Sequence, residues 1–291
     1  MKASTGDKIF YGINYAIMAI AALTCLIPLL NILALSLSDS SAIMSGRVTL
    51  FPIDIQLDSY RMLIERTKVV TAFSNSLVIT VGGTVLCMVF TVLAAYPLSR
   101  KYFYARKTIT LAVVFTMLFS GGLIPSYLVV KSLGLINTYW ALWLPGLVSV
   151  YNMMILRTFF EGIPEELVEA SRMDGCGEMR LLLQVILPLS VPVIATLTLF
   201  YGVGFWNSFQ NVLIYINDSN RMNLTVMVQQ MIHSQSLQET ASLSREEVDR
   251  LATPEGLKAA AVMVLVIPML VVYPFIQKYF VKGIMIGSIK G

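Results

Sequence analysis

The chain has 291 residues, of which 56% are hydrophobic and only 13% are charged, and its mean hydropathy is +0.74. Soluble domains carry about 25% charged residues, so the composition excludes an ordinary soluble globular domain and indicates a membrane protein. The formal net charge of +4 is distributed over short segments between apolar stretches. This pattern indicates that the positive charges set the orientation of the chain in the membrane, and it disfavours a nucleic-acid-binding surface.

Six windows free of charged residues follow one another along the chain, at 9–38, 69–99, 108–130, 132–156, 181–217 and 259–277. A helix crosses the hydrocarbon core with about 20 apolar residues, so each window can hold one span. We therefore predict an all-α membrane protein whose six transmembrane helices lie at about 12–37, 71–99, 108–130, 139–157, 182–212 and 258–279. Residues 1–291 are expected to form a single transmembrane domain. A seventh uncharged stretch, 222–238, is too polar to span and predicts an amphipathic surface helix.

The positive charges predict the orientation of these spans. Six spans place both termini on the same side of the membrane. With the termini inside, twelve of the 21 Lys and Arg residues lie on four short inner segments, and nine lie on three outer segments that are longer in total. The segment from Arg100 to Lys107 holds four cations and no acid. Because Lys and Arg favour cytosolic loops, both termini and this segment are predicted to be cytosolic.

A charged segment interrupted by glycine lies between the fourth and fifth windows. Pro164 suits the first turn of a helix, and the acids that follow it, Glu165, Glu166 and Glu169, favour the helix dipole. Gly175 can end this helix, and a second helix is expected to run from near Glu178 into the fifth span. We predict an elbow over about 164–180. Its acidic surface favours docking to a basic partner over contact with the anionic inner leaflet.

The elbow carries a recognisable motif. Glu169-Ala170-Ser171, then Gly175, then Val185-x-Leu187-Pro188 resemble the EAA loop of binding-protein-dependent ABC importers, with Ser171 in place of Ala and Val185 in place of Ile. The segments 137–140, 157–164 and 277–291 also resemble carbohydrate importer permeases, so the resemblance covers nearly the whole chain. The chain is similar to the maltose-permease G-type subunit and, more closely, to the lipoprotein-C or alginate-permease-like branch.

The resemblance implies a type I ABC importer permease fold with a cytosolic EAA-loop coupling helix, in the bacterial inner membrane. The chain would form half of a channel for oligo- or polysaccharides, with an acidic, alginate-like saccharide as one candidate. The implied partners are a second homologous permease, two copies of a cytosolic ATPase, an extracytoplasmic solute-binding protein, the saccharide and membrane lipid, but no nucleic acid. The residues to which the resemblance assigns ATPase coupling are Glu165, Glu169, Ala170, Ser171, Asp174, Gly175, Leu187, Pro188, Ser288 and Lys290.

Catalysis by this chain is not expected. The sequence has no Gly-x-x-x-x-Gly-Lys-Ser/Thr loop, so ATP and Mg²⁺ are expected on the partner ATPase. It also has no His-Glu-x-x-His or Gly-x-Ser-x-Gly motif, and no catalytic residue, cofactor or metal site is predicted. The alternative is a secondary carrier of small solutes without an ATPase partner. An ion-coupled carrier needs ionisable residues within its spans, and the six windows hold none.

Candidates for the substrate path come from aromatic and amide side chains within the windows, because sugar sites use aromatic faces against the rings and amides for the hydroxyls. The segment 204–211 offers both. We predict that Trp206, Asn207 and Gln210 line the path, with Ser126 and Tyr127 from the third window. In the maltose system the corresponding stretch of the partner subunit lines the sugar site. Packing between helices is the alternative role of these residues.

Overall fold

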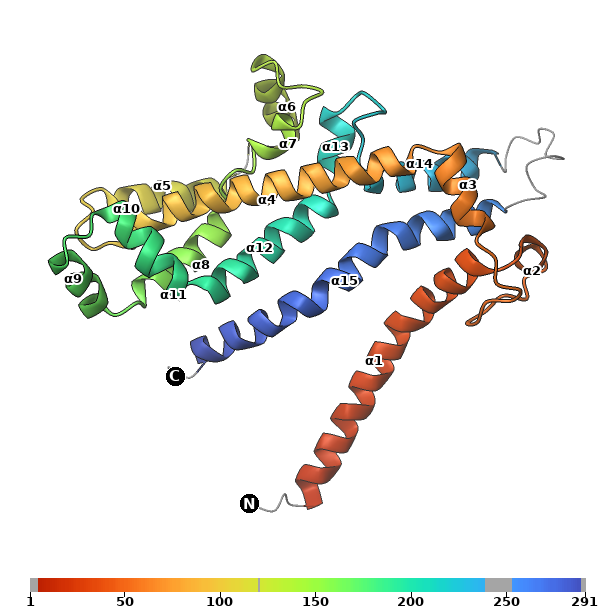
Figure 1. The fold of residues 1–291 in the computed structure, drawn as a ribbon, viewed down its shortest axis with the longest axis horizontal. Coiled ribbons are helices and arrows are strands. Elements are labelled where there is room, and N and C mark those ends of the chain that lie inside the picture. Colours follow the sequence, from red (N-terminus) through yellow and green to blue (C-terminus); the bar gives the residue numbers. More distant parts are fainter. Residues whose placement is uncertain (1–4, 120, 239–252, 289–291) are drawn as a thin grey trace. The chain divides into compact units, whose positions relative to one another are not determined.

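The computed structural model describes residues 5–119, 121–238 and 253–288, and this part of the chain is helical without a β-strand (Figure 1). The helices are α1 (Thr5–Leu37), α2 (Ser40–Met44), α3 (Asp58–Arg66), α4 (Val69–Ser99), α5 (Arg106–Leu118), α6 (Leu123–Ser132), α7 (Trp140–Trp143), α8 (Val150–Glu161), α9 (Glu165–Met173), α10 (Glu178–Leu181), the π-helix η1 (Leu182–Ile186), α11 (Leu187–Leu189), α12 (Val191–Trp206), α13 (Gln210–Tyr215), α14 (Leu224–Gln238) and α15 (Pro254–Ser288). The all-α prediction and the helix expected at 222–238 are confirmed.

Among residues 5–119, 121–238 and 253–288, three helices are long and apolar enough to cross a membrane: Gly6–Leu37 within α1, Val69–Ser99 as α4, and Pro254–Pro274 within α15. They match the first, second and sixth predicted spans. Two bent pairs raise the number to as many as five if each pair is one span. They are α5 with α6, and Glu178–Leu189 with α12. The count of six transmembrane helices stays a prediction.

The fourth predicted span, 139–157, is wrong as a single helix. α7 ends at Trp143, and α8 begins only at Val150 and continues to Glu161. Pro145 and Gly146 lie in the interval, where proline removes a backbone donor and glycine disfavours a helix. The Ser149 hydroxyl then caps α8 by accepting the Asn152 backbone N–H at 3.4 Å.

The third and fifth predicted spans are also interrupted. The third breaks between α5 and α6, where Gly122 has a φ of +85°. In the fifth, the axis turns by 84° between Leu189 and Val191, and α12 ends at Trp206 before the separate helix α13. Hydrophobicity averaged over a window does not register such breaks, because glycine, proline and serine are common in apolar segments.

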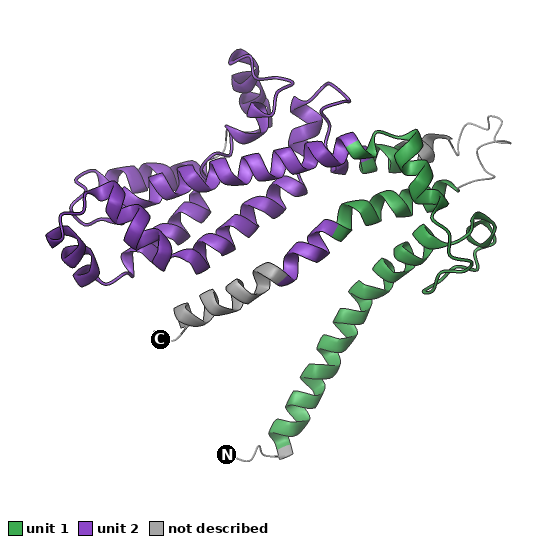
Figure 2. Ribbon diagram, viewed as in Figure 1, with its two compact units in different colours: residues 1–70, 228–267 green, residues 71–227, 268–291 purple. Residues whose placement is uncertain are grey.

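The described chain forms two compact units (Figure 2). Unit 1 comprises Met1–Val70 and Val228–Ile267. Its small core packs Ala34 of α1 against Ala42, Ile43 and Val48, and α1 contacts α3. The most apolar window of α1 has none of its residues buried within the described chain, so this helix presents its apolar surface to lipid or to other chains.

Unit 2 comprises Thr71–Met227 and Pro268–Gly291 and contains the candidate functional residues. Its main core packs α4 against α8 and α12 through fully buried side chains such as Cys87, Leu156 and Leu197. The hydroxyl groups of Thr91 in α4 and Tyr201 in α12 lie 2.7 Å apart, within the core. α4 therefore runs alongside α12 (Figure 1) and supports both the elbow and the cavity described below.

Candidate coupling elbow and solute cavity

The first arm of the elbow is α9, which follows Pro164. Glu165 and Glu166 occupy its first turn and Arg172 its last turn. This distribution matches the helix dipole, which favours acids at the N-terminus and bases at the C-terminus. Val168 is the buried residue of α9, so the helix is held by a narrow contact and leaves most of its surface available to a partner.

Gly175 forms the turn that ends α9. Its φ is +80°, in the left-handed region that glycine adopts without strain. The Gly175 N–H donates to the carbonyl of Arg172 at 2.9 Å, and the Cys176 N–H donates to the carbonyl of Ser171 at 3.1 Å. These two bonds make a Schellman motif. The predicted helix stop at Gly175 is confirmed, and the positive φ gives it a physical cause.

The second arm starts at Glu178, as predicted, and continues through η1 and α11. Leu187 and Pro188 belong to α11, one turn before the 84° bend. At the bend the Ser190 hydroxyl donates to the carbonyl of Ile186 at 2.7 Å. The motif positions Leu187 and Pro188 therefore lie in a short arm between the Gly175 turn and α12.

Glu178 joins the two arms to α4. Its Oε2 accepts hydrogen bonds from the hydroxyls of Tyr96 and Tyr102, each at 2.7 Å, and its Oε1 accepts one from Arg172 Nη2 at 2.9 Å. These three donors offset the cost of removing the Glu178 carboxylate from water. The Arg172 guanidinium also lies over the Tyr102 ring, 4.6 Å from its centroid. Glu178 therefore fixes the angle between α9 and α10.

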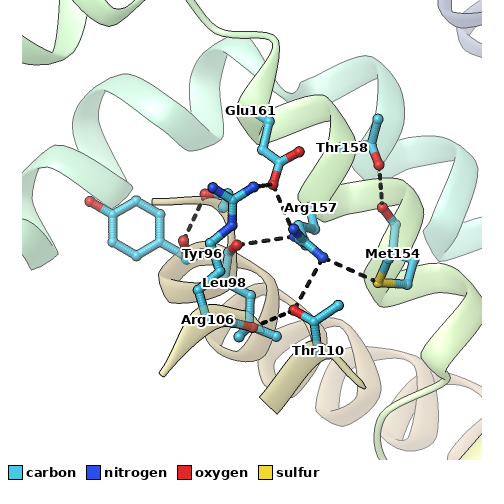
Figure 3. A network of polar contacts seen from close by, with 9 residues as sticks. Tyr96, Leu98, Arg106, Thr110, Met154, Arg157, Thr158 and Glu161 are labelled. Carbon is cyan, nitrogen blue, oxygen red and sulfur yellow. Dashed lines mark hydrogen bonds and ion pairs between the residues drawn. The ribbon is translucent and has the colours of Figure 1, made fainter. Parts of the chain in front are cut away.

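A second polar network holds the base of the elbow (Figure 3). Arg157 Nε donates to the Leu98 carbonyl at 3.0 Å and to Glu161 Oε1 at 2.9 Å, and Arg157 Nη1 donates to Thr110 Oγ1 at 3.2 Å. Arg106 forms an ion pair with the same Glu161 oxygen. Because one carboxylate binds two guanidinium groups from α5 and α8, the network ties the helices that carry α9.

The acids of the elbow divide into paired and unpaired groups. Lys101 Nζ lies 2.8 Å from Glu165 Oε2, and this hydrogen bond lowers the pKa of the Glu165 carboxyl. Glu166, Glu169 and Asp174 are exposed and form no ion pair with the described part of the chain. These three carboxylates are the negative charge that α9 and its turn offer to a partner.

The remaining predicted coupling residues differ in how far the structure describes them. Ala170 is exposed on α9, and the Ser171 hydroxyl donates to the carbonyl of Leu167 within the helix at 2.7 Å. Ser288 is the last residue of α15, but its side chain lies outside the described residues, as does the whole of Lys290. Coupling roles for all of these residues stay predictions.

A cavity of about 640 Å³ opens in unit 2 between α6, α7, α8, α12 and α13. Its polar lining comes from hydroxyl and amide side chains: Ser126, Ser149, Tyr151, Asn152, Tyr201, Ser208, Asn211 and Tyr215. Phe200 and Phe205 add aromatic surface. A Cβ at Gly83 of α4 would lie 2.7 Å from the Phe205 ring, so this glycine allows the ring to pack closely against α4. Aromatic faces beside hydroxyls and amides suit a polyhydroxylated ligand.

The five predicted path residues do not share this cavity. Ser126 lines it, and Tyr127 stacks parallel to Tyr215 with centroids 6.2 Å apart. Trp206 is only 3% exposed and packs edge-to-face on Phe73, so its indole has a packing role in this arrangement. Asn207 and Gln210 are exposed outside the cavity lining. Contact of these residues with a substrate stays a prediction.

The sequence reasoning missed two groups of residues. Within 204–211 the cavity is lined by Gly204, Phe205, Ser208 and Asn211. The predicted residues Trp206, Asn207 and Gln210 belong to the same stretch but do not line the cavity. The sequence identified this stretch, but it did not show the break between α12 and α13 that decides which residues face the cavity. The role of Glu178 was also missed, because its partner Tyr96 lies 82 positions away in the sequence.

Comparisons with known proteins cover nearly the whole chain. The family described as "Binding-protein-dependent transport system inner membrane component" matches residues 1–286. Two Bacillus subtilis (strain 168) proteins are each 38% identical: the polygalacturonan/rhamnogalacturonan transport system permease protein YtcP, over 98% of this chain and 99% of its own length, and Protein LplC, over 100% and 98%. In a crystal structure of a bacterial ABC transporter involved in the import of the acidic polysaccharide alginate, one chain matches with a TM-score of 0.88 and 29% identity, covering 96% of this chain and 99% of that chain.

Proposed function

Because the chain belongs to the family of binding-protein-dependent transport system inner membrane components, we propose that it is the permease subunit of an ATP-driven importer for oligo- or polysaccharides. The match over residues 1–286 carries this conclusion, and similarity to permeases named for saccharide transport supports the substrate class. The chain is a multi-pass inner-membrane protein and a channel component, and the chemical step of ATP hydrolysis belongs to another subunit.

The mechanism follows from the elbow. We propose that this chain pairs with a second homologous permease, that two ATPase subunits bind at the elbows, and that a solute-binding protein delivers the saccharide to the opposite face. Closure of the ATPase pair would move α9, and the Glu178 hydrogen bonds would carry that movement into α4 and α10. The segment from α10 to α11 leads into α12, and α12 lines the cavity. Movement of α9 would therefore change the shape of the cavity.

Reconstitution tests this function. The chain, its partner permease, the ATPase and the binding protein should together give saccharide uptake into proteoliposomes that depends on ATP. Fragments of polygalacturonan, rhamnogalacturonan and alginate are the first substrates to test, because relatives are named for them. A thermal-shift screen of the binding protein against these saccharides identifies the ligand. Uptake that proceeds without the ATPase would instead establish a secondary carrier.

We also propose six transmembrane helices with both termini in the cytosol, from the distribution of Lys and Arg residues. The expected result concerns Tyr104→Cys in a variant lacking Cys25, Cys87 and Cys176. Tyr104 is exposed in the segment between α4 and α5, so a membrane-impermeant maleimide should label it only after cells are permeabilised. Phe51→Cys, also at an exposed position but in a predicted outer segment, is the matched control and should label in intact cells. Labelling of position 104 in intact cells would reverse the orientation.

A further inference from the structure

A small pocket with an unpaired cation lies between α9 and the end of α4. The pocket has a volume of about 80 Å³, and Arg100, immediately after α4, is one of its lining residues. Arg100 is 8% exposed, so the guanidinium is held at the floor of the pocket. The charged residues that line the pocket are Arg100, Lys101, Glu161, Glu165, Glu169 and Arg172.

Four of these six charges are already neutralised within the chain. Glu161 pairs with Arg106 and Arg157, Lys101 pairs with Glu165, and Arg172 pairs with Glu178. The two that remain are Arg100 at the floor and Glu169 on α9, neither of which forms an ion pair with the described residues. The pocket therefore presents a buried positive charge and a separate exposed negative charge.

The guanidinium of Arg100 lacks hydrogen-bond partners on one edge within the described part of the chain. Its Nε and Nη2 atoms are buried without a hydrogen-bond partner among the described residues. The N–H bonds of these two nitrogens run parallel within the guanidinium plane and form the side-on fork that binds both oxygens of a carboxylate. The Tyr96 ring lies 4.8 Å from the guanidinium carbon and offsets only part of the cost of burying the charge. A carboxylate satisfies both nitrogens and the charge together.

We propose that this pocket receives an Asp or Glu side chain of the ATPase subunit, which pairs with Arg100. The inference rests on the proposed function, since it names the chemistry by which the elbow recognises its partner. The size of the pocket supports it, because about 80 Å³ is enough to admit a carboxylate.

The test is a double-mutant cycle in the complete transporter. Arg100→Met removes the charge and keeps an unbranched stem, and replacing a buried unpaired charge with an apolar group is expected to preserve folding. Each Asp and Glu on the permease-facing surface of the ATPase is changed to Asn or Gln, and ATPase binding to the permease pair is measured at fixed salt. Lys107→Met is the matched control, because Lys107 is exposed in the same segment and does not line the pocket.

One ATPase carboxylate should stand out. With wild-type permease its replacement should weaken binding by roughly 30-fold, and with Arg100→Met it should cause no further loss. Arg100→Lys should retain part of the affinity, because an ammonium keeps the charge without the fork. Thermal unfolding of the permease pair reports whether each variant is folded.

Other occupants give different results. If Glu169, which lines the pocket, pairs with Arg100 in the protein, Arg100→Met will be non-additive with Glu169→Gln in the thermal stability of the permease pair alone, which would overturn the proposal. If the pocket holds water or a free anion, all ATPase substitutions will be additive with Arg100→Met, and the proposal also fails. A permease that never binds an ATPase would instead contradict the proposed function itself.

Discussion

Glu169→Lys should prevent stable assembly of this permease with its ATPase. Glu169 is exposed on α9 and forms no ion pair within the described chain, so its carboxylate is free to pair with a cation of the ATPase. Loss of one member of a partly buried charged pair, followed by like-charge repulsion, should weaken binding by about 100-fold or more. Co-purification of the ATPase with the permease pair measures this effect directly.

Glu166→Lys is the matched control for that prediction. It makes the same charge change on an exposed, unpaired acid of the same helix, but Glu166 does not line the Arg100 pocket. We expect a loss of only a few-fold, from the weaker general attraction between charges. Equal losses for the two variants would mean that the net charge of α9, and no specific pair at Glu169, holds the ATPase.

The elbow was the best predicted part of this protein, because local rules define it. Pro164, the early acids and Gly175 predicted the limits of α9, and the structure places them as expected. The start of the second helix at Glu178 followed from the same reasoning. Each of these features depends on backbone geometry within a few residues, which a single sequence records.

Features that depend on distant contacts were not predictable in the same way. The contacts of Glu178 with Tyr96 and Tyr102 join segments that are 82 and 76 positions apart. The cavity uses Phe205 and Ser208, whereas Trp206 turns into the core against Phe73. In an apolar helix both faces carry similar residues, so the sequence identifies the stretch without identifying the open side.

Gly175→Val should leave the transporter assembled and uncouple ATP hydrolysis from saccharide transport. At a φ of +80° a Cβ is strained by about 1–2 kcal/mol, and a β-branched side chain by more. A Cβ at this position meets no atom within 4 Å, so the penalty comes from the backbone and can be relieved if the turn changes shape. The Schellman bonds would then be lost, and α9 would change its direction relative to α10.

Two further variants separate this cause from others. Gly177→Val makes the same change two residues later, where φ is −70° and a Cβ again meets nothing within 4 Å, and it should retain coupled transport. Gly175→Asn should recover part of the coupling, because asparagine tolerates the left-handed region. ATP hydrolysis and saccharide uptake are measured in the same proteoliposomes, and the ratio of the two rates reports coupling.

The outcome decides what the elbow does. If Gly175→Val hydrolyses ATP without transport and Gly177→Val does not, the direction of α9 couples hydrolysis to transport. This result is expected because hydrogen bonds connect α9 to α4 through Arg172 and Glu178. If Gly175→Val and Gly177→Val both transport at the normal rate, the elbow is only a connector and coupling must run through another contact. Because Glu169→Lys acts on docking and Gly175→Val on direction, a variant that fails in both assays would point to misfolding, which thermal unfolding of the permease pair would reveal.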